Sequence, residues 1–462
     1  MKNIIFILIY FLPVFVCAQQ KLDKSSPIDY MWENVGNAGF SAWGANYISI
    51  AFNQSGQPYV AYEDYAYGFK ATVMKFNGSN WVNVGNPGFS IGPAYYISLG
   101  VSQADQPYIA FSNGENFNMA TVMKFDGTNW VNVGNACFSP DGAACLSLAF
   151  SPIGEPYVAY LDFGNSNKAT VMKFNGTTWV NIGIAGFSSG EVNWTSLAFN
   201  PYNGQPYVAY KDIANDGKAT VMKFNGTNWE NVGNAGFTVG HVEYTELAFS
   251  PSGEPHVAFV DFGNSRKITV MKFNGTNWVD VGNAGFSATT ADYTNLAFSP
   301  NGDPYVAYED YVNAGKVTVM KFDGTNWINV GNDGFSAGTA QYIDLALSPA
   351  GQPYVAYQDY EYSGNATVMK YDSVVVGIND PQESRLSLYP NPVTEILSIE
   401  FNGNNNYVKF IEIYDLQGKK ISKFQTCETK INIDTKNYLR GLYFIKIRTR
   451  ELNYIEKFCK TE

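Results

Sequence analysis

Histidine and cysteine are both scarce in this sequence, with 2 and 5 residues among 462. So few imidazoles exclude a metal site built from several histidines, and any Ser-His-Asp or Cys-His arrangement would have to use one of the two. His256 replaces a tyrosine that recurs in otherwise similar segments, so we interpret it as a packing residue. His241 remains, but no nucleophile motif of the G-x-S-x-G type accompanies it.

Positive charge is also limited, because 30 Lys and Arg are outnumbered by 41 Asp and Glu, and charged residues make up 15% of the chain. Helical proteins usually carry more Lys and Glu on their exposed faces, so we expect few helices. The net charge of −11 disfavours nucleic acid as a partner, since phosphates are bound by clustered Lys or Arg.

Long apolar runs are missing except at the start of the chain. The segment MKNIIFILIYFLPVFVCAQQ combines one Lys, an apolar stretch and a small residue at Ala18. This pattern predicts a secretory signal peptide over residues 1–18. Lipid attachment at Cys17 is the weaker alternative, because Val16 is bulky where such sites usually have a small residue. No later run could span a bilayer, so we expect no transmembrane segment once the signal peptide is removed.

What the sequence does contain is a repeat. A stretch resembling TVMKFNGTNWVNVGNAGFS recurs along the chain, and its tryptophans are 49 residues apart five times and 50 once. These tryptophans are Trp32, Trp81, Trp130, Trp179, Trp229, Trp278 and Trp327. Each period holds four segments of strand length, typified by YTELAF, PYVAY, KATVMKF and WVNVG, with Gly, Pro, Asn and Asp between them. We assign the tryptophans to packing between outer strands.

Four strands in a period of this length are the signature of a β-propeller blade. The segment 244–275 resembles NHL-type propeller repeats. The last repeat ends at Tyr371 with no fourth strand, whereas residues 31–41 look like a fourth strand with no preceding blade. We therefore predict an all-β, seven-bladed propeller over residues 19–371, closed by pairing of the N-terminal strand with 367–371, which removes two free edges.

The chain changes character after a predicted linker, residues 372–385. The segments SLYPNPVTEILSIEF, IEIYDLQGKKI and YLRGLYFIKI indicate several strands with tight turns. With Pro390-Asn391-Pro392, Asp415-Leu416-Gln417-Gly418 and Gly441-Leu442-Tyr443, residues 386–462 resemble the C-terminal sorting domain of type IX secretion cargo in Bacteroidota. The resemblance implies a small β-sandwich-like domain, export by the type IX secretion machinery, and a secreted or outer-membrane-surface protein.

Four cysteines remain after the signal peptide: Cys137, Cys145, Cys427 and Cys459. In an oxidising compartment they could form two disulfides, one from the first pair and one from the second. The first pair is equally compatible with two small buried thiols.

An aspartate recurs two residues after PYVAY in six of the seven repeats, at Asp64, Asp162, Asp212, Asp261, Asp310 and Asp359. We favour a role as turn caps over a ring of acids for calcium or sugar hydroxyls. The motif Asp-x-x-Asn-x-Gly supplies fewer oxygens than the 6–8 of a calcium site, so no cofactor is expected and calcium has weak support. Repeated acids are also equivalent to one another, whereas a glycosidase needs two unlike carboxylates, so we predict no enzymatic activity.

The segments before each first strand vary, yet six of the seven end in an aromatic residue. These are Tyr47, Tyr96, Trp194, Tyr244, Tyr293 and Tyr342. In a propeller they should ring the channel mouth, close to acids such as Glu191 and Glu243. Aromatics beside carboxylates suit sugar rings; a structural plug over the channel is the alternative.

These features predict an exported propeller that binds an extracellular glycan or protein, for example as an adhesin. One alternative is a polysaccharide-degrading enzyme that uses the carboxylates of one blade with His241 or a tyrosine. Another is a purely structural surface protein. An enzyme should show one deep pocket with non-repeated acids, and a binding protein several equivalent shallow sites.

Overall fold

The computed structural model describes residues 28–375, 386–401, 409–416, 419–448 and 453–461. The predicted signal peptide and most of the predicted linker lie outside these residues. The chain divides into two compact units: Tyr30–Val374 forms one, and the C-terminal residues belong to the other.

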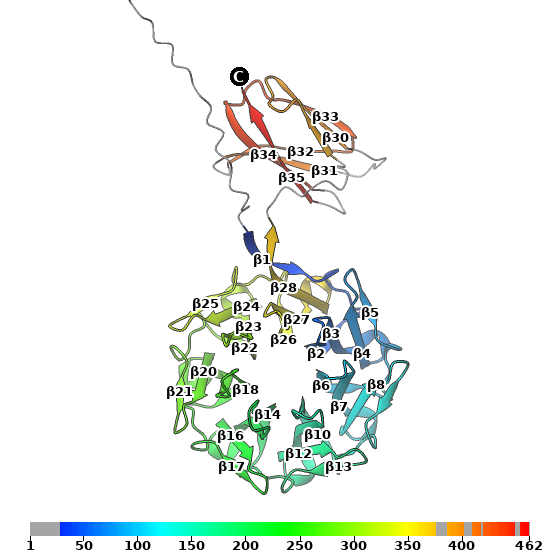
Figure 1. The fold of residues 1–462 in the computed structure, drawn as a ribbon, viewed down its shortest axis with the longest axis vertical. Helices are drawn as coiled ribbons and strands as arrows, with labels where there is room; N and C mark the ends of the chain where they lie inside the picture. Colours follow the sequence, from blue (N-terminus) through cyan, green and yellow to red (C-terminus); the bar gives the residue numbers. More distant parts are fainter. Residues whose placement is uncertain (1–27, 376–385, 402–408, 417–418, 449–452, 462) are drawn as a thin grey trace, which may run out of the picture. The chain divides into compact units, whose positions relative to one another are not determined.

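The larger unit is a ring of seven four-stranded antiparallel sheets (Figure 1). The innermost strands are β2 (Ala45–Phe52), β6 (Ala94–Val101), β10 (Ala143–Phe150), β14 (Val192–Phe199), β18 (Val242–Phe249), β22 (Ala291–Phe298) and β26 (Ala340–Leu347). The second strands are β3 (Pro58–Asp64), β7 (Pro107–Asn113), β11 (Pro156–Asp162), β15 (Pro206–Asp212), β19 (Pro255–Asp261), β23 (Pro304–Asp310) and β27 (Pro353–Asp359).

The third strands are β4 (Lys70–Phe76), β8 (Met119–Phe125), β12 (Lys168–Phe174), β16 (Lys218–Phe224), β20 (Lys267–Phe273), β24 (Lys316–Phe322) and β28 (Asn365–Val375). The fourth strands of blades 1–6 are β5 (Trp81–Asn83), β9 (Trp130–Asn132), β13 (Trp179–Asn181), β17 (Trp229–Asn231), β21 (Trp278–Asp280) and β25 (Trp327–Asn329). Each repeat therefore forms the four strands that the sequence predicts.

Blade 7 takes its fourth strand from the start of the chain. Its order is β26-β27-β28-β1, with β1 spanning Ile28–Asn34. The Val35 amide donates to the Val368 carbonyl at 2.9 Å, and Lys370 forms an ion pair with Glu33 at 3.1 Å. The predicted closure of the ring by its N-terminal strand is confirmed.

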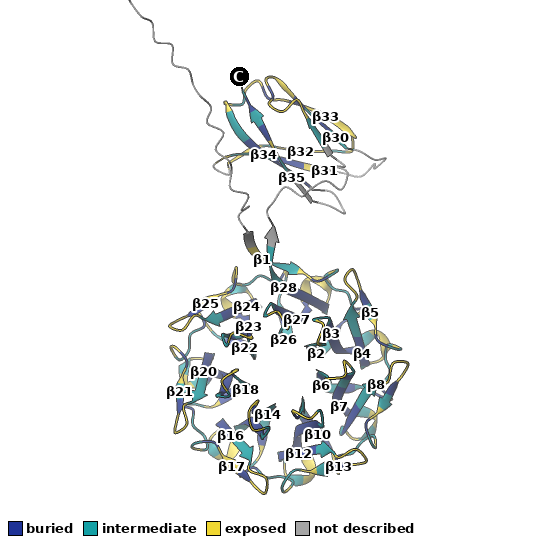
Figure 2. Cartoon of the chain, viewed as in Figure 1, coloured by how far each residue is buried: buried dark blue, intermediate teal, exposed yellow. Residues whose placement is uncertain are grey.

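The core lies between neighbouring blades, where Figure 2 shows buried residues along the strands and exposed ones at the turns. Between blades 6 and 7, for example, Val317 and Val319 pack with Leu345, Val355 and Tyr357, all at most 5% exposed. Because side chains of one strand alternate between two neighbouring interfaces, nearly every residue of a second strand is buried. This explains why PYVAY is apolar throughout rather than alternating.

The repeated tryptophan links each blade to the preceding one. Trp81 Nε1 donates to the Val35 carbonyl at 2.7 Å, and the equivalent bond recurs around the ring, ending with Trp32 and the Val330 carbonyl. Each indole also stacks on the phenylalanine of a G-F-S segment, as Trp81 does on Phe40 at 4.5 Å. The tryptophan motif is repeated because every blade interface needs the same link.

The recurring aspartates are buried. Four of the six accept a cap bond from the following turn, at Asp64, Asp261, Asp310 and Asp359, whereas Asp162 and Asp212 make no cap bond. Asp64 accepts hydrogen bonds from the Ala66 amide at 3.0 Å and from Thr72 Oγ1 at 2.8 Å. The threonine bond recurs in four further blades. This geometry agrees with the capping role, since both carboxylate oxygens of Asp64 are occupied.

His256 occupies the place of a tyrosine, as predicted, and is 4% exposed. Burial lowers its pKa to about 4. Below pH 6.5 the unfolded chain binds a proton here that the folded chain binds only near pH 4. This group therefore does not change the free energy of unfolding above pH 6.5. As the pH falls from about 6.5 to 4, it lowers the free energy of unfolding by roughly 3 kcal/mol.

We expect His256→Tyr, which restores the residue of the sister blades, to reduce this acid sensitivity. Melting temperatures of parent and variant should differ more at pH 4.5 than at pH 7, in favour of the variant. An equal difference at both pH values would contradict burial of the neutral imidazole.

The C-terminal unit contains two sheets that share one core. The first has the order β29 (Leu386–Tyr389), β30 (Ile396–Phe401), β33 (Lys430–Asp434). The second has the order β32 (Lys420–Thr426), β31 (Lys409–Asp415), β34 (Gly441–Arg448), β35 (Asn453–Lys460). Leu397 and Ile399 pack with Ile411, Ile413 and Ile445, all fully buried. The expected β-sandwich-like domain is confirmed.

The disulfides suggested by the composition are not formed, because Cys137, Cys145 and Cys459 are free thiols. Cys137 replaces the glycine of a turn after an outer strand, where its sulfur lies 3.7 Å from Asn113 Nδ2. Cys145 lies on innermost strand β10 instead. The two residues are close in sequence but belong to different blades, Cys137 to blade 2 and Cys145 to blade 3. Cys459, on β35, has no bridge to Cys427.

Candidate functional site

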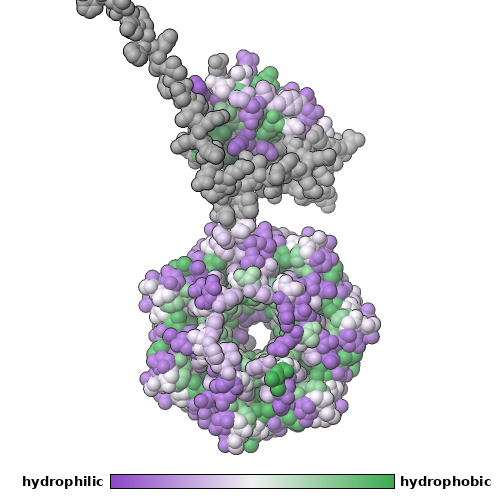
Figure 3. Space-filling model, viewed as in Figure 1, coloured by the Kyte–Doolittle hydropathy of each residue, from purple (hydrophilic) through white to green (hydrophobic). Residues whose placement is uncertain are grey.

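The seven innermost strands surround a central channel, and Figure 3 shows an opening through the middle of the ring. At one end, each second strand runs into a short 3-10 turn, such as η1 (Tyr65–Tyr67) after β3. At the other end, tight turns such as residues 53–57 join the innermost and second strands. We call these the η end and the turn end of the channel.

An aromatic side chain lies near the η end on every innermost strand except β10. This set, called the collar below, consists of Tyr47, Tyr96, Trp194, Tyr244, Tyr293 and Tyr342. Each is at a β-bulge and has a positive φ of 46–54°. Bulky residues rarely adopt this conformation, and bulges commonly re-aim a side chain. The fold thus holds six aromatic residues in an unfavourable backbone conformation at one level of the channel.

The collar rings contact one another in sequence around the channel. Tyr47 lies between Tyr96 and Tyr342, with ring centroids 5.1 Å away on both sides. Tyr293 lies 5.5 Å from Tyr342 and 5.1 Å from Tyr244. Tyr244 in turn lies 4.3 Å from Trp194. Six blades therefore present one continuous aromatic surface.

The predicted placement of these aromatics needs one correction. They were expected in loops before the first strand, but each is the third residue of the strand itself. The reason is the bulge, which turns a strand residue toward the channel mouth. In blade 3 the equivalent residue is Cys145, also at positive φ (52°), so the collar has a gap there.

The collar phenols remain protonated at neutral pH. Burial raises the pKa of Tyr47, and the neighbouring Tyr96 and Tyr342 raise it further. Burial also raises the pKa of Tyr244, with a contribution from Asp292. Each half-buried ring therefore offers an apolar face and a hydroxyl that can donate or accept a hydrogen bond.

The two predicted acids have different surroundings. Glu243, on β18 beside Tyr244, forms an ion pair with Lys211 at 3.7 Å across the boundary between blades 5 and 4. Glu191 is exposed and lies one residue before β14. The structure places Glu243 beside the collar, whereas Glu191 is exposed at the η end, where its carbonyl accepts the Ile213 amide at 3.0 Å.

A cluster of Arg266, Asp292 and Tyr311 lies beside Tyr244 and Tyr293; the sequence marks Asp292 as a neighbour of these aromatics but not its two partners. Arg266, which opens blade 5's third strand, donates a hydrogen bond to Asp292 on β22. Tyr311 Oη donates to the other carboxylate oxygen of Asp292 at 3.0 Å. Burial raises the pKa of Tyr311 to about 12, so this phenol also stays protonated.

Two further carboxyl groups lie behind the collar. Glu63 is 2% exposed and accepts a hydrogen bond from Asn46 Nδ2 at 3.0 Å. Glu309 is 3% exposed, and its Oε2 has no hydrogen-bond partner among the described residues. Burial raises the pKa of each to about 7; the charge of Asp292 adds to this effect at Glu309. Both acids are thus poised to titrate near neutral pH.

A second layer of polar residues lines the channel wall below the collar. It consists of Ser49, Ser98, Ser147, Ser196, Glu246, Asn295 and Asp344. Each serine oxygen accepts a backbone amide of the next blade, as Ser49 does from Leu99, and Asp344 does the same for Ile50 at 2.8 Å. Burial, followed by the charge of Asp344, raises the pKa of Glu246 to about 8.

The hydrogen bonds of this layer join neighbouring blades. Its two acidic residues, Glu246 and Asp344, lie in blades 5 and 7. Within the described part of the chain, no three His, Cys, Asp or Glu side chains are grouped as a metal site requires.

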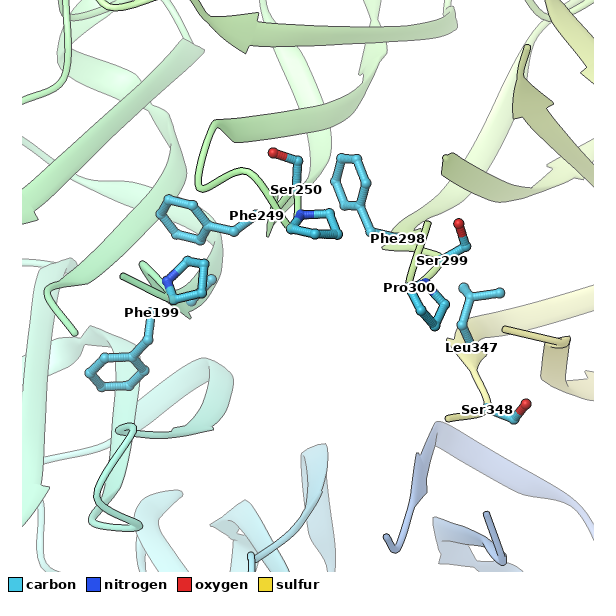
Figure 4. A pocket seen from close by; sticks show the side chains of 11 residues that line it. Phe199, Phe249, Ser250, Phe298, Ser299, Pro300, Leu347 and Ser348 are labelled. Carbon is cyan, nitrogen blue, oxygen red and sulfur yellow. The ribbon is translucent and has the colours of Figure 1, made fainter. Parts of the chain in front are cut away.

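The turn end carries an open apolar pocket of about 500 Å³. Its rim is formed by the ends of four innermost strands and the prolines that follow them, and Figure 4 shows the rings of Phe199, Phe249 and Phe298 arranged around it. Polar contributions come from Ser250, Ser299 and Ser348, whose hydroxyls already accept turn amides. This pocket offers apolar contact and few free hydrogen-bonding groups.

Residues 387–461 match the family model of the secretion system C-terminal sorting domain. The chain carries a secretion sorting domain. The predicted resemblance is confirmed, and with it the localisation: the sorting domain directs the protein out of the cell, to be secreted or held at the outer-membrane surface. In the structure the Pro390-Asn391-Pro392 segment of this domain is fixed to β35, where Asn391 Oδ1 accepts the Cys459 amide at 2.9 Å.

Several solved structures are similar in fold to large parts of this chain. An ulvan lyase of polysaccharide lyase family PL25, solved with bound -[GlcA(1-4)Rha3S]-, is 12% identical over 71% of this chain and 94% of its own, with a TM-score of 0.50. PorZ, a surface component of the type IX secretion system of Porphyromonas gingivalis, is 13% identical with a TM-score of 0.46. That match covers 91% of this chain, which spans 60% of the PorZ chain.

A fucose-binding lectin from Aleuria aurantia with a six-bladed propeller is 15% identical over 65% of this chain and 100% of its own, with a TM-score of 0.45. Similarity at these identities is one of fold. No curated protein matches the sequence. None of the helices in the described ranges has the length and hydropathy to cross a bilayer.

Proposed function

We propose that this protein is an exported glycan-binding propeller whose collar stacks against sugar rings. The observation that carries the proposal is the collar itself: six aromatic residues, each held at positive φ in a bulge, form one half-exposed surface at the channel mouth. Unfavourable backbone conformations concentrate at functional sites, because the surrounding structure must maintain them. The same conformation occurs at Cys145 in blade 3, so the bulge is a feature of every blade; what six blades add is an aromatic side chain at this position.

The chemistry of the collar suits carbohydrate. Pyranose rings present apolar faces that stack on aromatic rings and hydroxyls that exchange hydrogen bonds with phenols and carboxylates. Tyr244 and Trp194 offer the closest pair of rings, with Glu243 next in sequence to Tyr244. The channel is open in Figure 3, which argues against a plug formed by these rings.

One observation favours a second function, cleavage of a polysaccharide. Glu63 and Glu309 occupy a position that is acidic in only two of the seven blades, and a pKa of about 7 suits a general acid or base. Incubation with a bound polysaccharide, followed by a search for shortened or unsaturated products, distinguishes this activity from binding alone.

The collar is tested by replacing Trp194 or Tyr244 with Ala. We expect either change to weaken glycan binding by about 1–3 kcal/mol, the typical value of a buried large side chain. The melting temperature should stay close to that of the parent for Trp194→Ala and fall somewhat for Tyr244→Ala, because the Tyr244 ring packs against the core between blades 5 and 6. Isothermal titration calorimetry and thermal melts on the same samples measure both quantities.

The matched control is Trp43→Ala, since Trp43 is 67% exposed near the same end but lies outside the collar. Its affinity should equal that of the parent. A collar variant that loses melting temperature but binds with unchanged affinity would show that the collar is a structural plug.

A further inference from the structure

The innermost strands that line the channel carry acidic side chains and no basic ones. The seven innermost strands together contain four carboxylates, Glu243, Glu246, Asp292 and Asp344, and no Lys, Arg or His. Glu243 and Asp292 are paired with Lys211 and Arg266, and burial raises the pKa of Glu246 to about 8, so Glu246 is largely protonated at neutral pH. Asp344 accepts hydrogen bonds from Ile50 and Asn295 and has no cationic partner among the described residues. The wall below the collar is therefore mildly acidic, and a cleft lined by charge of one sign attracts the opposite sign.

The basic side chains near the collar are already engaged. Lys211 pairs with Glu243, and Arg266 pairs with Asp292. The lysines that open third strands, such as Lys70 and Lys316, lie two strands outward from the channel. Neither cationic partner leaves a free positive charge for an anionic ligand.

Buried acids add to this field from behind the aromatic rings. The charge of Glu309 acts on Tyr244, Tyr293 and Tyr311, and it is itself influenced by Asp292 and Arg266. Its unpartnered Oε2 means that no described hydrogen bond offsets this charge.

Glu63 occupies the corresponding place in blade 1. Its charge acts on Tyr47 and Tyr342, and its hydrogen-bond partner Asn46 also accepts from Gln358 Nε2 at 3.0 Å. Carboxylates thus lie behind the collar on both sides of blade 7.

We propose that the collar selects glycans that carry ammonium groups, such as deacetylated amino-sugar oligomers, over uronate or sulfated glycans. This rests on the proposed function and names its ligand class. An ammonium group over a tyrosine or tryptophan face is attracted by the negative face of the ring, more strongly when the site is partly desolvated. The acids around and behind the collar strengthen that attraction and repel carboxylates and sulfates.

The test compares three oligosaccharides of equal length on the full protein by isothermal titration calorimetry: N-acetylglucosamine oligomers, their N,N,N-trimethylglucosamine counterparts and glucuronate oligomers. The trimethylated probe has a fixed charge, so the pH acts on the protein alone. We expect it to bind about tenfold more tightly than the acetylated probe, and the glucuronate probe to bind most weakly. Added salt should reduce the difference.

Variants assign the preference to the buried acids. Glu309→Gln and Glu63→Gln should each lower the ratio of trimethylated to acetylated affinity several-fold. Glu254→Gln, at the turn end where Glu254 pairs with Lys272, is the matched control and should leave the ratio unchanged. In the parent protein the ratio should rise between pH 6 and pH 8 as Glu63 and Glu309 lose their protons, which keeps the test valid should a variant fail to fold.

The outcomes are distinct. Failure of all glycan probes to bind would contradict the proposed function. Equal binding of acetylated and trimethylated probes would leave glycan binding intact and overturn the ammonium preference. Tighter binding of an oligolysine peptide than of the trimethylated oligomer would overturn it in favour of a protein ligand.

Discussion

Deleting residues 19–36 should lower the melting temperature of the propeller by about 10 °C or more. The deletion removes β1, and with it the Trp32 bond to the Val330 carbonyl and the stacking of Trp32 on Phe335 at 4.0 Å. Trp32 is partly buried, and the deletion also removes the buried Val35 and the pairing of β1 with β28. Together these losses should reach the roughly 3–5 kcal/mol of one buried tryptophan, and each kcal/mol shifts the melting temperature by about 2–4 °C in a large domain. The open ring would also expose two strand edges, so aggregation on heating is expected.

Differential scanning calorimetry of the full chain measures this effect. The matched control deletes residues 19–27, which precede β1, and should melt like the parent. If the longer deletion also melted like the parent, β1 would not be the strand that closes the ring.

A chain ending at Asp380 should be retained inside the outer membrane. The truncation removes the sorting domain, residues 387–461, and leaves the predicted signal peptide and the propeller. Because the two units have separate cores, the propeller should fold and accumulate in the periplasm. Immunoblots of medium, surface and periplasmic fractions from cells producing the parent or the truncated chain should show almost complete loss from the first two.

The reciprocal fusion serves as the control. A periplasmic reporter that carries residues 376–462 at its C-terminus should appear outside the cell. Truncated protein in the medium in normal amounts would show that the sorting domain is not what directs export.

Much of the fold could be predicted from the sequence because the blades repeat. The tryptophan spacing gave the blade length, and the missing tryptophan after Tyr371 together with the unaccompanied Trp32 gave the closure. Each of these residues makes the same contact in every blade, so one repeated motif reports one repeated interaction. The C-terminal motifs likewise identified the sorting domain.

The site was predicted less completely because, apart from the collar aromatics, its residues do not recur in every blade. The aromatic residues were found, but a β-bulge has no mark in the residue pattern, so Tyr47 was expected in a loop rather than in β2. Glu63 and Glu309 precede the recurring aspartate, at a position that varies from blade to blade. That variation among otherwise similar repeats was the signal that could have drawn attention to them.

The ion pairs beside the collar could not be predicted from the sequence, because their partners are far apart along the chain. Arg266 and Asp292 are 26 residues apart and belong to neighbouring blades. Cys137 and Cys145 show the converse: a disulfide and two free thiols were equally compatible with their closeness in sequence, and the two residues belong to different blades. In both cases the arrangement of blades around the ring decides which side chains meet.

The most direct test of the central claim is a glycan-array screen of the chain from residue 19, run beside the double variant Trp194→Ala/Tyr244→Ala. Both proteins are first shown by thermal melts to be folded at the temperature of the screen. Our account predicts that the parent binds a restricted set of glycans, enriched in amino sugars, and that the double variant loses these signals. Binding of the same glycans by the double variant, or binding of none by the parent, would contradict it.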